Sequence, residues 1–263
     1  MKQTIFYSGI FIACIVLFLC SNNVNLDGLA VGVASAIIFL LVQTISNNLE
    51  HLSYLWYSVR YWNSNIRLSV SYLFRIKVAG KHFLIKGKRF DQFQPVGGVF
   101  KRYPSSEVFF KSINALDDNL IPIDEKSDGD LRIRVKGSDL ISFLKWFNSM
   151  DGREISGWRE FYEELISTNL FPESIFPYIS YQYVRRYSHP IRYSSYAQSK
   201  ELLIAEIYEL LLTPQQEEFL LNLVNSKSQE YIWADSDQIR RRGTVPGQQC
   251  QSVNISEHSS WIL

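Results

Sequence analysis

The run Arg159-Glu160-Phe161-Tyr162-Glu163-Glu164 places three carboxylates at helical spacing. On a helix, Glu160, Glu163 and Glu164 occupy positions i, i+3 and i+4, so their side chains share one face. Like charges at this spacing destabilise a helix by about 0.2–0.5 kcal/mol per pair. A divalent cation such as Mg2+ prefers hard oxygen ligands and would turn this repulsion into a binding site. The alternative interpretation is a solvated helix face on which Arg159 pairs with Glu163.

A second pattern predicts a long β-strand upstream of this run. Apolar residues occupy every second position from Ile66 to Val78, which is typical of a strand with one buried face. Ala79-Gly80-Lys81 predicts a turn, and residues 82–88 are expected to return as the second strand of a hairpin.

The chain beyond residue 200 predicts further elements. Glu201 to Leu212 is rich in apolar residues. Thr213 and Pro214, followed by an acidic first turn, predict the start of a helix. Residues 230–235 are expected to form a Trp-bearing strand, and residues 236–239 a short helix.

The N-terminal part of the chain has a different character. Two uncharged, mostly apolar runs, Ile5 to Cys20 and Leu29 to Ile45, contain 16 and 17 residues, near the lower limit for a bilayer span. Polar residues 21–28 separate them, so we expect a transmembrane helical hairpin over residues 1–48. A cleaved signal peptide is the alternative for the first run, but only Lys2 precedes the run and no A-x-A site follows it.

Charges flanking the predicted hairpin indicate its orientation. Lys2 precedes the first run, Arg60 and Arg67 follow the second, and Asp27 is the only charge in the turn. The positive-inside rule then places the protein as a multi-pass protein of the cell inner membrane with both termini in the cytoplasm. Aromatic residues gather in the juxtamembrane linker 49–65, suited either to the headgroup layer or to packing on the following domain.

Composition excludes several functions. The chain of 263 residues, 46% hydrophobic, is long enough for one domain of about 200 residues plus an anchor. A net charge of +1 gives no electrostatic case for a nucleic-acid polymer as partner. The three cysteines and four histidines are scattered, so they indicate neither a zinc site nor a His-based nucleophilic triad.

Three other segments offer candidate contacts. Tyr181 and Tyr183 alternate onto one strand face and Arg185 continues it; such a face could hold a nucleotide, because rings stack on bases and guanidinium groups bind phosphates. The alternative is a half-buried strand rich in tyrosine, a residue that favours strands.

Arg240-Arg241-Arg242 is suited to phosphates or anionic headgroups, or is a solvated helix end. The apolar residues 261–263 are expected to dock onto the domain.

The run at 159–164 resembles the core of the Nudix box, which reads Arg-Glu-apolar-any-Glu-Glu on a helix that follows a glycine loop. Upstream, Gln94-Pro95-Val96-Gly97-Gly98-Val99 is similar to the Pro-Gly-Gly that ends a strand in Nudix domains. The predicted hairpin, the Trp-bearing strand and the short acidic helix are also similar to this family. The resemblance covers about residues 66–243 and implies an α+β fold, with a Nudix-like α/β/α sandwich domain at 66–263.

The box departs from the family pattern at several points. Its acidic position falls on Asp151 and its glycine position on Lys145. If Gly98 supplies the glycine, an insertion at about residues 101–145 splits the box. Ile166 stands where the trailing glycine is expected. These departures concern catalysis more than fold.

The resemblance also implies a chemistry, the metal-assisted attack of water on a phosphoanhydride. Mg2+ (or Mn2+) would be held by Glu160, Glu163 and Glu164, of which Glu163 and Glu164 are the candidate catalytic residues. Gly97 and Gly98 would let the backbone lie close to the ligand.

Two further roles follow from the family pattern. Arg159 would orient the acidic loop, and Asp151 or Glu154 would complete a second metal site.

A two-helix anchor joined to a Nudix-like domain with a split box resembles one group in particular. These are the membrane-anchored Nudix effectors associated with bacterial cyclic-oligonucleotide synthases (CD-NTases) in the anti-phage systems called CBASS. The resemblance implies a cyclic di- or trinucleotide ligand, contact with the lipid bilayer and a homo-oligomer. Within it, two mechanisms stay open: a nucleotide sensor whose hairpins disrupt the membrane, and a membrane-tethered Mg-dependent hydrolase of a nucleoside diphosphate-linked compound. A membrane-attached housekeeping pyrophosphohydrolase is a third interpretation.

Overall fold

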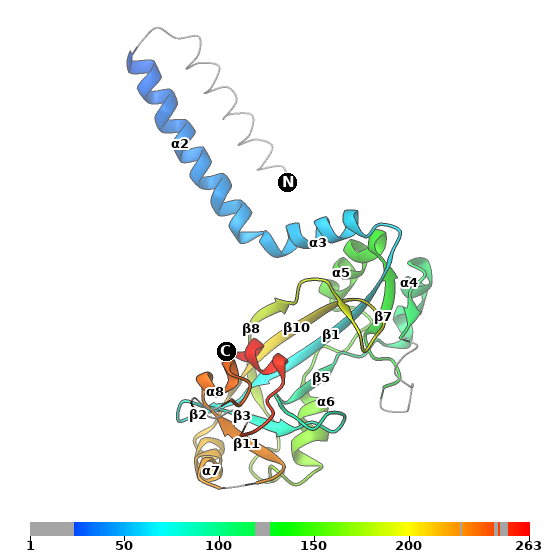
Figure 1. Cartoon of the computed structure of the whole chain (residues 1–263), viewed down its shortest axis with the longest axis vertical. Helices are drawn as coiled ribbons and strands as arrows, with labels where there is room; N and C mark the ends of the chain where they lie inside the picture. Colours follow the sequence, from blue (N-terminus) through cyan, green and yellow to red (C-terminus); the bar gives the residue numbers. More distant parts are fainter. Residues whose placement is uncertain (1–23, 119–126, 227, 245–246, 248–251) are drawn as a thin grey trace. The chain divides into compact units, whose positions relative to one another are not determined.

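The chain divides into two units, Met1–Arg60 and Tyr61–Leu263, and each is described by itself (Figure 1). The computed structural model describes residues 24–118, 127–226, 228–244, 247 and 252–263.

Two helices, α2 (Val24–Asn47) and α3 (Leu49–Arg60), make up the described part of the first unit. The second predicted apolar run lies within α2. The first run lies outside the described residues, and the hairpin as a whole stays a prediction. None of the helices in the described part of the chain combines the length and the apolar character that crossing a membrane requires.

The second unit contains two β-sheets. The strands of the large sheet are β1 (Asn65–Arg75), β5 (Gly97–Val99), β6 (Leu116–Asp117), β7 (Arg132–Lys136), β8 (Ser180–Ser188), β9 (Arg192–Ser194) and β10 (Ser199–Leu211). Those of the small sheet are β2 (Lys77–Val78), β3 (Lys81–Lys86), β4 (Phe93–Gln94) and β11 (Tyr231–Ala234).

Strand β1 is central in the large sheet, whose order is β6-β7-β1-β10-β8, with β5 paired to β1 and β9 to β10. β1 and β10 run parallel, with Arg67 opposite Glu201 and Ser71 opposite Ala205, whereas β5 and β7 pair with β1 antiparallel. The second unit is therefore an α+β domain with a mixed, curled sheet.

Helices and single turns cover the sheets. Their bounds are α4 (Glu107–Ser112), α5 (Leu140–Ser149), α6 (Trp158–Phe161), α7 (Pro214–Val224), α8 (Ser236–Arg240), the 3-10 helices η1 (Pro104–Ser106), η2 (Gly137–Asp139) and η4 (Glu257–Ile262), and the π-helical turn η3 (Tyr162–Ile166). In Figure 1, α4 and α5 lie at one end of the large sheet and α7 and α8 at the other.

The strand predicted over residues 66–78 is confirmed, but the predicted hairpin with residues 82–88 is only partly correct. The alternating apolar side chains from Ile66 to Val78 are all buried. The return strand β3 pairs with the two-residue β2 and with β4 and β11, but not with β1. β1 instead pairs over nine residues with β10. Alternation defines a strand and its buried face, but a distant strand of matching length can provide the longer ladder.

The elements near the C-terminus begin as the sequence predicts. At the start of α7, the Thr213 hydroxyl accepts a hydrogen bond from the Gln216 backbone at 3.3 Å, and the Gln216 side chain accepts one from the Thr213 backbone at 3.1 Å. Asp235 and Gln238 form the same reciprocal pair at the start of α8. The strand β11 lies within the predicted range 230–235.

Aromatic rings fill one face of the large sheet, next to α5 and α6. The ring centroids of Tyr72 and Phe100 are 4.8 Å apart, and those of Phe74 and Phe161 are 5.7 Å apart. Phe147 of α5 extends the cluster and packs on Phe100 at 5.3 Å. This face of the sheet is the closed core of the domain.

The last residues dock onto the domain, as the sequence predicts. Trp261 is 3% exposed and Ile262 is fully buried, and both pack with Leu73 of β1. Arg75 donates to the Ile262 carbonyl at 2.5 Å, and Arg185 donates to the Trp261 carbonyl at 2.9 Å. Residues 252–263 therefore form part of the domain, and they cover part of the other face of the large sheet.

Candidate functional site

The box run lies on one short helix, formed by α6 and its π-helical continuation η3. Phe161 and Leu165 on this helix are fully buried and fix its apolar side against the core. The side chains of Glu160, Glu163 and Glu164 all line a single cavity on the other side. A single π turn inside a helix is a frequent feature of functional sites.

Arg159 connects the box to the loop before it. Its guanidinium donates two hydrogen bonds to the Glu154 carboxylate, at 3.0 and 3.1 Å, one to Glu160 at 2.7 Å and one to the Val99 carbonyl at 2.9 Å. Burial would lower the pKa of Arg159, but the Glu154 hydrogen bonds and the Glu160 charge raise it above its usual value. Arg159 is therefore a fixed cation that orients the acidic loop and the first box glutamate.

The acidic partner of Arg159 is Glu154, five positions before it, and not Asp151. Glu154 is 6% exposed, and its carboxylate also accepts from the Lys101 backbone at 3.2 Å. Asp151 is exposed and lies outside the cavity lining. The loop between α5 and α6 thus brings the Glu154 carboxylate, and not that of Asp151, to the guanidinium.

The two glycines of β5 are pressed between β1 and the box helix. The Gly97 backbone N–H donates to the Glu164 carboxylate at 2.9 Å. A Cβ at Gly97, whose φ is +143°, would lie 2.2 Å from the Tyr72 carbonyl oxygen, and one at Gly98 would lie 2.1 Å from a Glu160 carboxylate oxygen. At Gly97 only glycine allows this approach, which joins Pro-Gly-Gly and the box across about sixty residues of intervening chain.

The three box glutamates differ in their surroundings. Burial raises the pKa of Glu164 to about 8, with the Gly97 N–H lowering it and the charge of Glu160 raising it further. Glu160 is bound to Arg159, whereas the Glu163 side chain is 44% exposed and lies 3.6 Å from Arg159. Within the described residues, no three His, Cys, Asp or Glu side chains are grouped so that they could hold a metal ion. Two of the predicted metal ligands, Glu160 and Glu164, are bound to the Arg159 guanidinium and to the Gly97 N–H.

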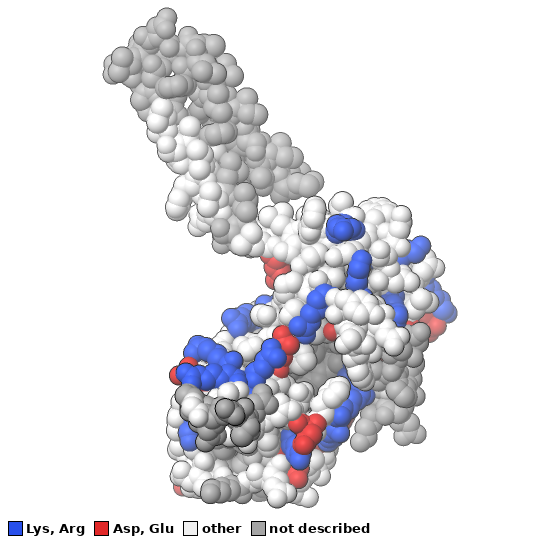
Figure 2. Space-filling view, in the orientation of Figure 1, with Lys and Arg blue, Asp and Glu red and all other residues white. Residues whose placement is uncertain are grey.

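The cavity next to the box, which we call the box cavity, has a volume of about 970 Å3. Besides the glutamates and Asp130, it is lined by five cations: Lys88, Arg89, Lys101, Arg132 and Arg159. Arg89 makes no hydrogen bond or ion pair with any residue that the structure describes. On the face drawn in Figure 2, Lys and Arg form a broken band across the second unit, with fewer Asp and Glu between them.

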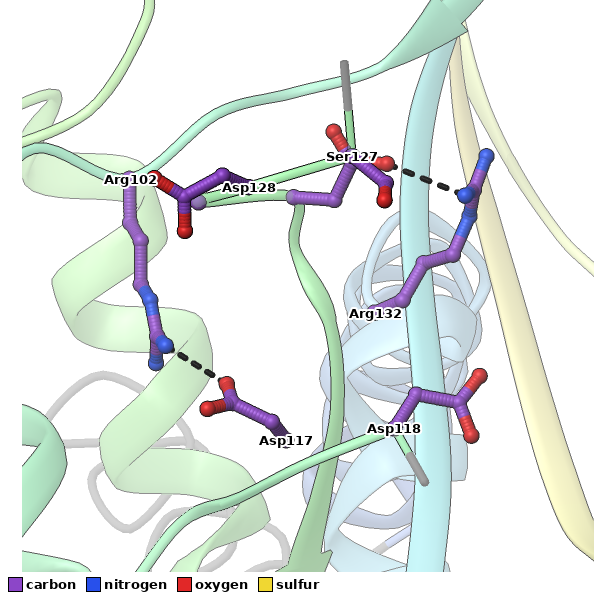
Figure 3. A pocket seen from close by; sticks show the side chains of 8 residues that line it. Arg102, Asp117, Asp118, Ser127, Asp128 and Arg132 are labelled. Carbon is purple, nitrogen blue, oxygen red and sulfur yellow. Dashed lines mark hydrogen bonds and ion pairs between the residues drawn. The ribbon is translucent and has the colours of Figure 1, made fainter. Parts of the chain in front are cut away.

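A second cavity of about 360 Å3 adjoins the box cavity, and we call it the β1 cavity because β1 residues form its floor. The two cavities share Gly97, Gly98, Arg89 and Arg132 in their linings. Arg132 also borders a third, small cavity of about 30 Å3, across which it faces Arg102 and its partner Asp117 (Figure 3). Arg132 thus lies where all three cavities meet.

The predicted tyrosine face lies elsewhere. Tyr181 and Tyr183 line neither the box cavity nor the β1 cavity. The Tyr181 hydroxyl accepts a hydrogen bond from the Gly157 backbone at 3.1 Å, and its ring packs on Phe74 at 5.5 Å. Both tyrosines contact the ring of Tyr208, which corresponds to the alternative of a half-buried strand face.

Arg185 does not continue this face. Strand β8 has a bulge, so that Tyr183 lies opposite Tyr208 and Arg185 lies opposite Ile207. The additional residue, Val184, reverses the side to which later residues point. Arg185 consequently lies on the other face and donates to carbonyl groups of the C-terminal segment.

Sequence reasoning missed Arg89 and Arg132, which line both cavities, and Tyr196, which lines the β1 cavity. One signal was available: Ser69 and Ser71 lie on the second face of a central strand, opposite to the face of Leu68 and Val70. Large apolar residues are the rule on both faces of such a strand.

Fold and cleft together define a Nudix-type domain. The family model of the SMODS-associated NUDIX domain matches residues 65–263. The chain therefore belongs to the SMODS-associated NUDIX family, which links it to effectors of nucleotide-signalling defence systems. Comparison with curated proteins finds no match.

Proposed function

We propose that this protein is an effector of a bacterial cyclic-oligonucleotide anti-phage system, and that its Nudix-like domain binds the nucleotide signal, a cyclic di- or trinucleotide. The observation that carries the proposal is the box cavity, where five cations line a large opening while two of the three box carboxylates are already bound to protein donors. Guanidinium and ammonium groups are the usual ligands of phosphates. Such a cavity favours anion binding over a ready metal site.

The contacts of the glutamates provide a route from binding to response. A phosphate that reaches the Gly97 N–H or the Arg159 guanidinium competes with Glu164 and Glu160 for the same donors. Release of Glu164 removes a contact that fixes the box helix against β5, whereas release of Glu160 frees a carboxylate within the helix. Ligand binding is then coupled to the position of this helix, because the helix keeps its contact with β5 in the free protein and loses it in the bound protein.

The alternative function is a Mg-dependent Nudix hydrolase of a nucleoside diphosphate-linked compound. One observation favours it: Glu160, Glu163 and Glu164 all line the same cavity. A ligand that released Glu160 and Glu164 from their present partners would leave all three carboxylates facing it.

We propose further that the protein acts at the inner membrane as a homo-oligomer, with residues 1–48 as a multi-pass anchor and both termini in the cytoplasm. The two uncharged runs of 16 and 17 residues support this assignment, as does the excess of basic residues beyond them. In this mechanism, ligand binding reorganises the hairpins and disrupts the membrane, which kills the infected cell.

Ligand retention and cleavage distinguish the two functions. The full chain is mixed with cyclic di- and trinucleotides and with linear nucleoside diphosphate compounds, with Mg2+, and mass spectrometry follows retained ligand and products. Glu163→Gln is tested in parallel. An intact, retained cyclic nucleotide supports the sensor, and a product that is lost in the variant supports the hydrolase. Binding of none of these compounds would overturn both.

Membrane potential in cells tests the second part of the proposal. Depolarisation on activation should survive Glu163→Gln and disappear on deletion of residues 1–48. Intact membranes together with depletion of a cellular nucleotide would contradict it and favour the hydrolase.

A further inference from the structure

Strand β1 is central in the large sheet, yet the middle of one of its faces is open. Ser69 and Ser71 are half-buried, whereas their neighbours Leu68, Val70 and Tyr72 on the opposite face are fully buried. The two serines lie on the floor of the β1 cavity. A central strand is normally covered on both faces in a mixed α/β sheet, so small polar residues here leave a space that larger side chains would fill.

The opening of this cavity carries two exposed aromatic rings from separate loops. Phe90, between β3 and β4, and Tyr196, between β9 and β10, have ring centroids 5.8 Å apart at an interplanar angle of 73°. Phe90 is 51% and Tyr196 is 59% exposed, so both keep ring surface available. Exposed aromatic rings at a cavity rim provide stacking surfaces for a base.

Cations lie between this rim and the box. Arg89 and Arg132 line both cavities, and Arg192 borders the β1 cavity while it donates to Glu257 at 3.3 and 3.4 Å. Burial lowers the pKa of Arg132, the charge of Asp130 opposes this, and the charges of Arg89 and Arg67 lower it further. Arg132 is already paired with Asp130 at 3.0 Å, whereas Arg89 has no ion-pair partner among the described residues. A bound anion would therefore offset the repulsion between the two guanidinium groups chiefly at Arg89.

We propose that the β1 cavity is a second subsite that takes a nucleotide unit, so that one ligand spans both cavities. A phosphate of the ligand lies at Arg89 and Arg132, and a base lies against Phe90 and Tyr196. The cavity volume of about 360 Å3 is within the usual range of small-molecule sites, about 300–1,000 Å3. This inference rests on the proposed function and adds to it that two nucleotide units of the ligand are bound by different residues, one unit in each cavity.

The test compares ligands that differ by one nucleotide unit. Equilibrium binding to the full chain is measured with adenosine and guanosine 5′-monophosphates. The same measurement uses the corresponding linear dinucleotides with a 5′-phosphate and the corresponding cyclic dinucleotides. We expect at least one dinucleotide to bind about 5- to 150-fold more tightly than its mononucleotide, the gain that stacking of one base supplies.

Two variants assign this gain to the β1 cavity. Tyr196→Ala should remove most of the gain and leave mononucleotide affinity unchanged. Its matched control is Tyr193→Ala, because Tyr193 of β9 is 67% exposed and lies outside the linings of both cavities. Ser69→Leu fills the cavity floor and should have the same effect as Tyr196→Ala; thermal unfolding confirms that each variant is folded.

The outcomes separate this inference from the proposed function. Equal affinity for mono- and dinucleotides, or a gain that persists in both Tyr196→Ala and Ser69→Leu, overturns the second subsite while the proposed function stands. Failure of every nucleotide to bind overturns the proposed function and the subsite with it. A gain that is lost in those two variants and kept in Tyr193→Ala supports both.

Discussion

The two faces of strand β1 share one backbone and one set of sheet hydrogen bonds, but they have opposite roles. On one face, the side chains at even positions from Ile66 to Phe74 are fully buried. On the other, Arg67, Ser69 and Ser71 border the β1 cavity. The closed face contributes burial of apolar surface, and the open face leaves a space for a ligand. Stability and ligand binding should therefore be separable by substitutions at adjacent positions.

The largest expected effect lies on the closed face. Leu68→Ala removes a fully buried side chain and should lower the free energy of unfolding by about 2–5 kcal/mol. Ser69→Ala, one residue away on the open face, should change it by less than about 0.5 kcal/mol. Urea unfolding of the full-length variants measures both, and equal losses would show that the open face is part of the core.

The pH dependence of unfolding tests a buried titratable side chain of the domain. His82 of β3 is 2% exposed, and burial, followed by the charges of Lys77 and Arg75, lowers its pKa to about 4. Because this value is below that of the unfolded chain, about 6.5, the contribution of His82 is complete above pH 6.5. It decreases as the pH falls towards 4, by about 2–3 kcal/mol. His82→Gln should weaken the pH dependence of unfolding in this interval, and identical slopes would contradict the assignment.

The glycines next to the open face should have an intermediate effect. Gly97→Ala brings a Cβ onto the Tyr72 carbonyl in a strained backbone conformation and should cost about 1–3 kcal/mol. Gly98→Ala meets the mobile end of the Glu160 side chain, so it should cost less stability and instead displace Glu160 from Arg159. Unfolding and ligand binding of both variants separate the two effects; a larger stability loss for Gly98→Ala would be inconsistent with this geometry.

The smallest effect on stability is expected at Glu163. Its side chain is 44% exposed and 3.6 Å from Arg159, so Glu163→Gln should change the free energy of unfolding by less than about 0.5 kcal/mol. The same substitution should abolish Mg2+-dependent hydrolysis and leave nucleotide-triggered depolarisation in place. Glu218→Gln on the exposed side of α7 is the matched control. Unchanged hydrolysis in Glu163→Gln would remove the box from the catalytic mechanism.

Local patterns predicted the elements with strong local causes. Alternation from Ile66 to Val78 predicted β1, and Thr213 with Pro214 predicted the start of α7, because both depend on nearby residues. The β8 bulge was not predictable from alternation, since the sequence around Val184 continues to read as a regular strand. The contact of Arg159 with Glu154 was not predictable for a similar reason, since spacing along the chain does not show how a loop folds back.

By itself, the sequence determined the box helix, the central strand with its buried face, and the glycine pair. Each is determined by periodicity or by backbone conformation within a few residues. Tertiary structure alone decided that Gly97 binds Glu164, that Arg89 and Arg132 lie between two cavities, and that Phe90 meets Tyr196. These residues are distant in sequence, and their proximity depends on the pairing of β1 with β10 and on the packing of loops around it, which no local pattern encodes.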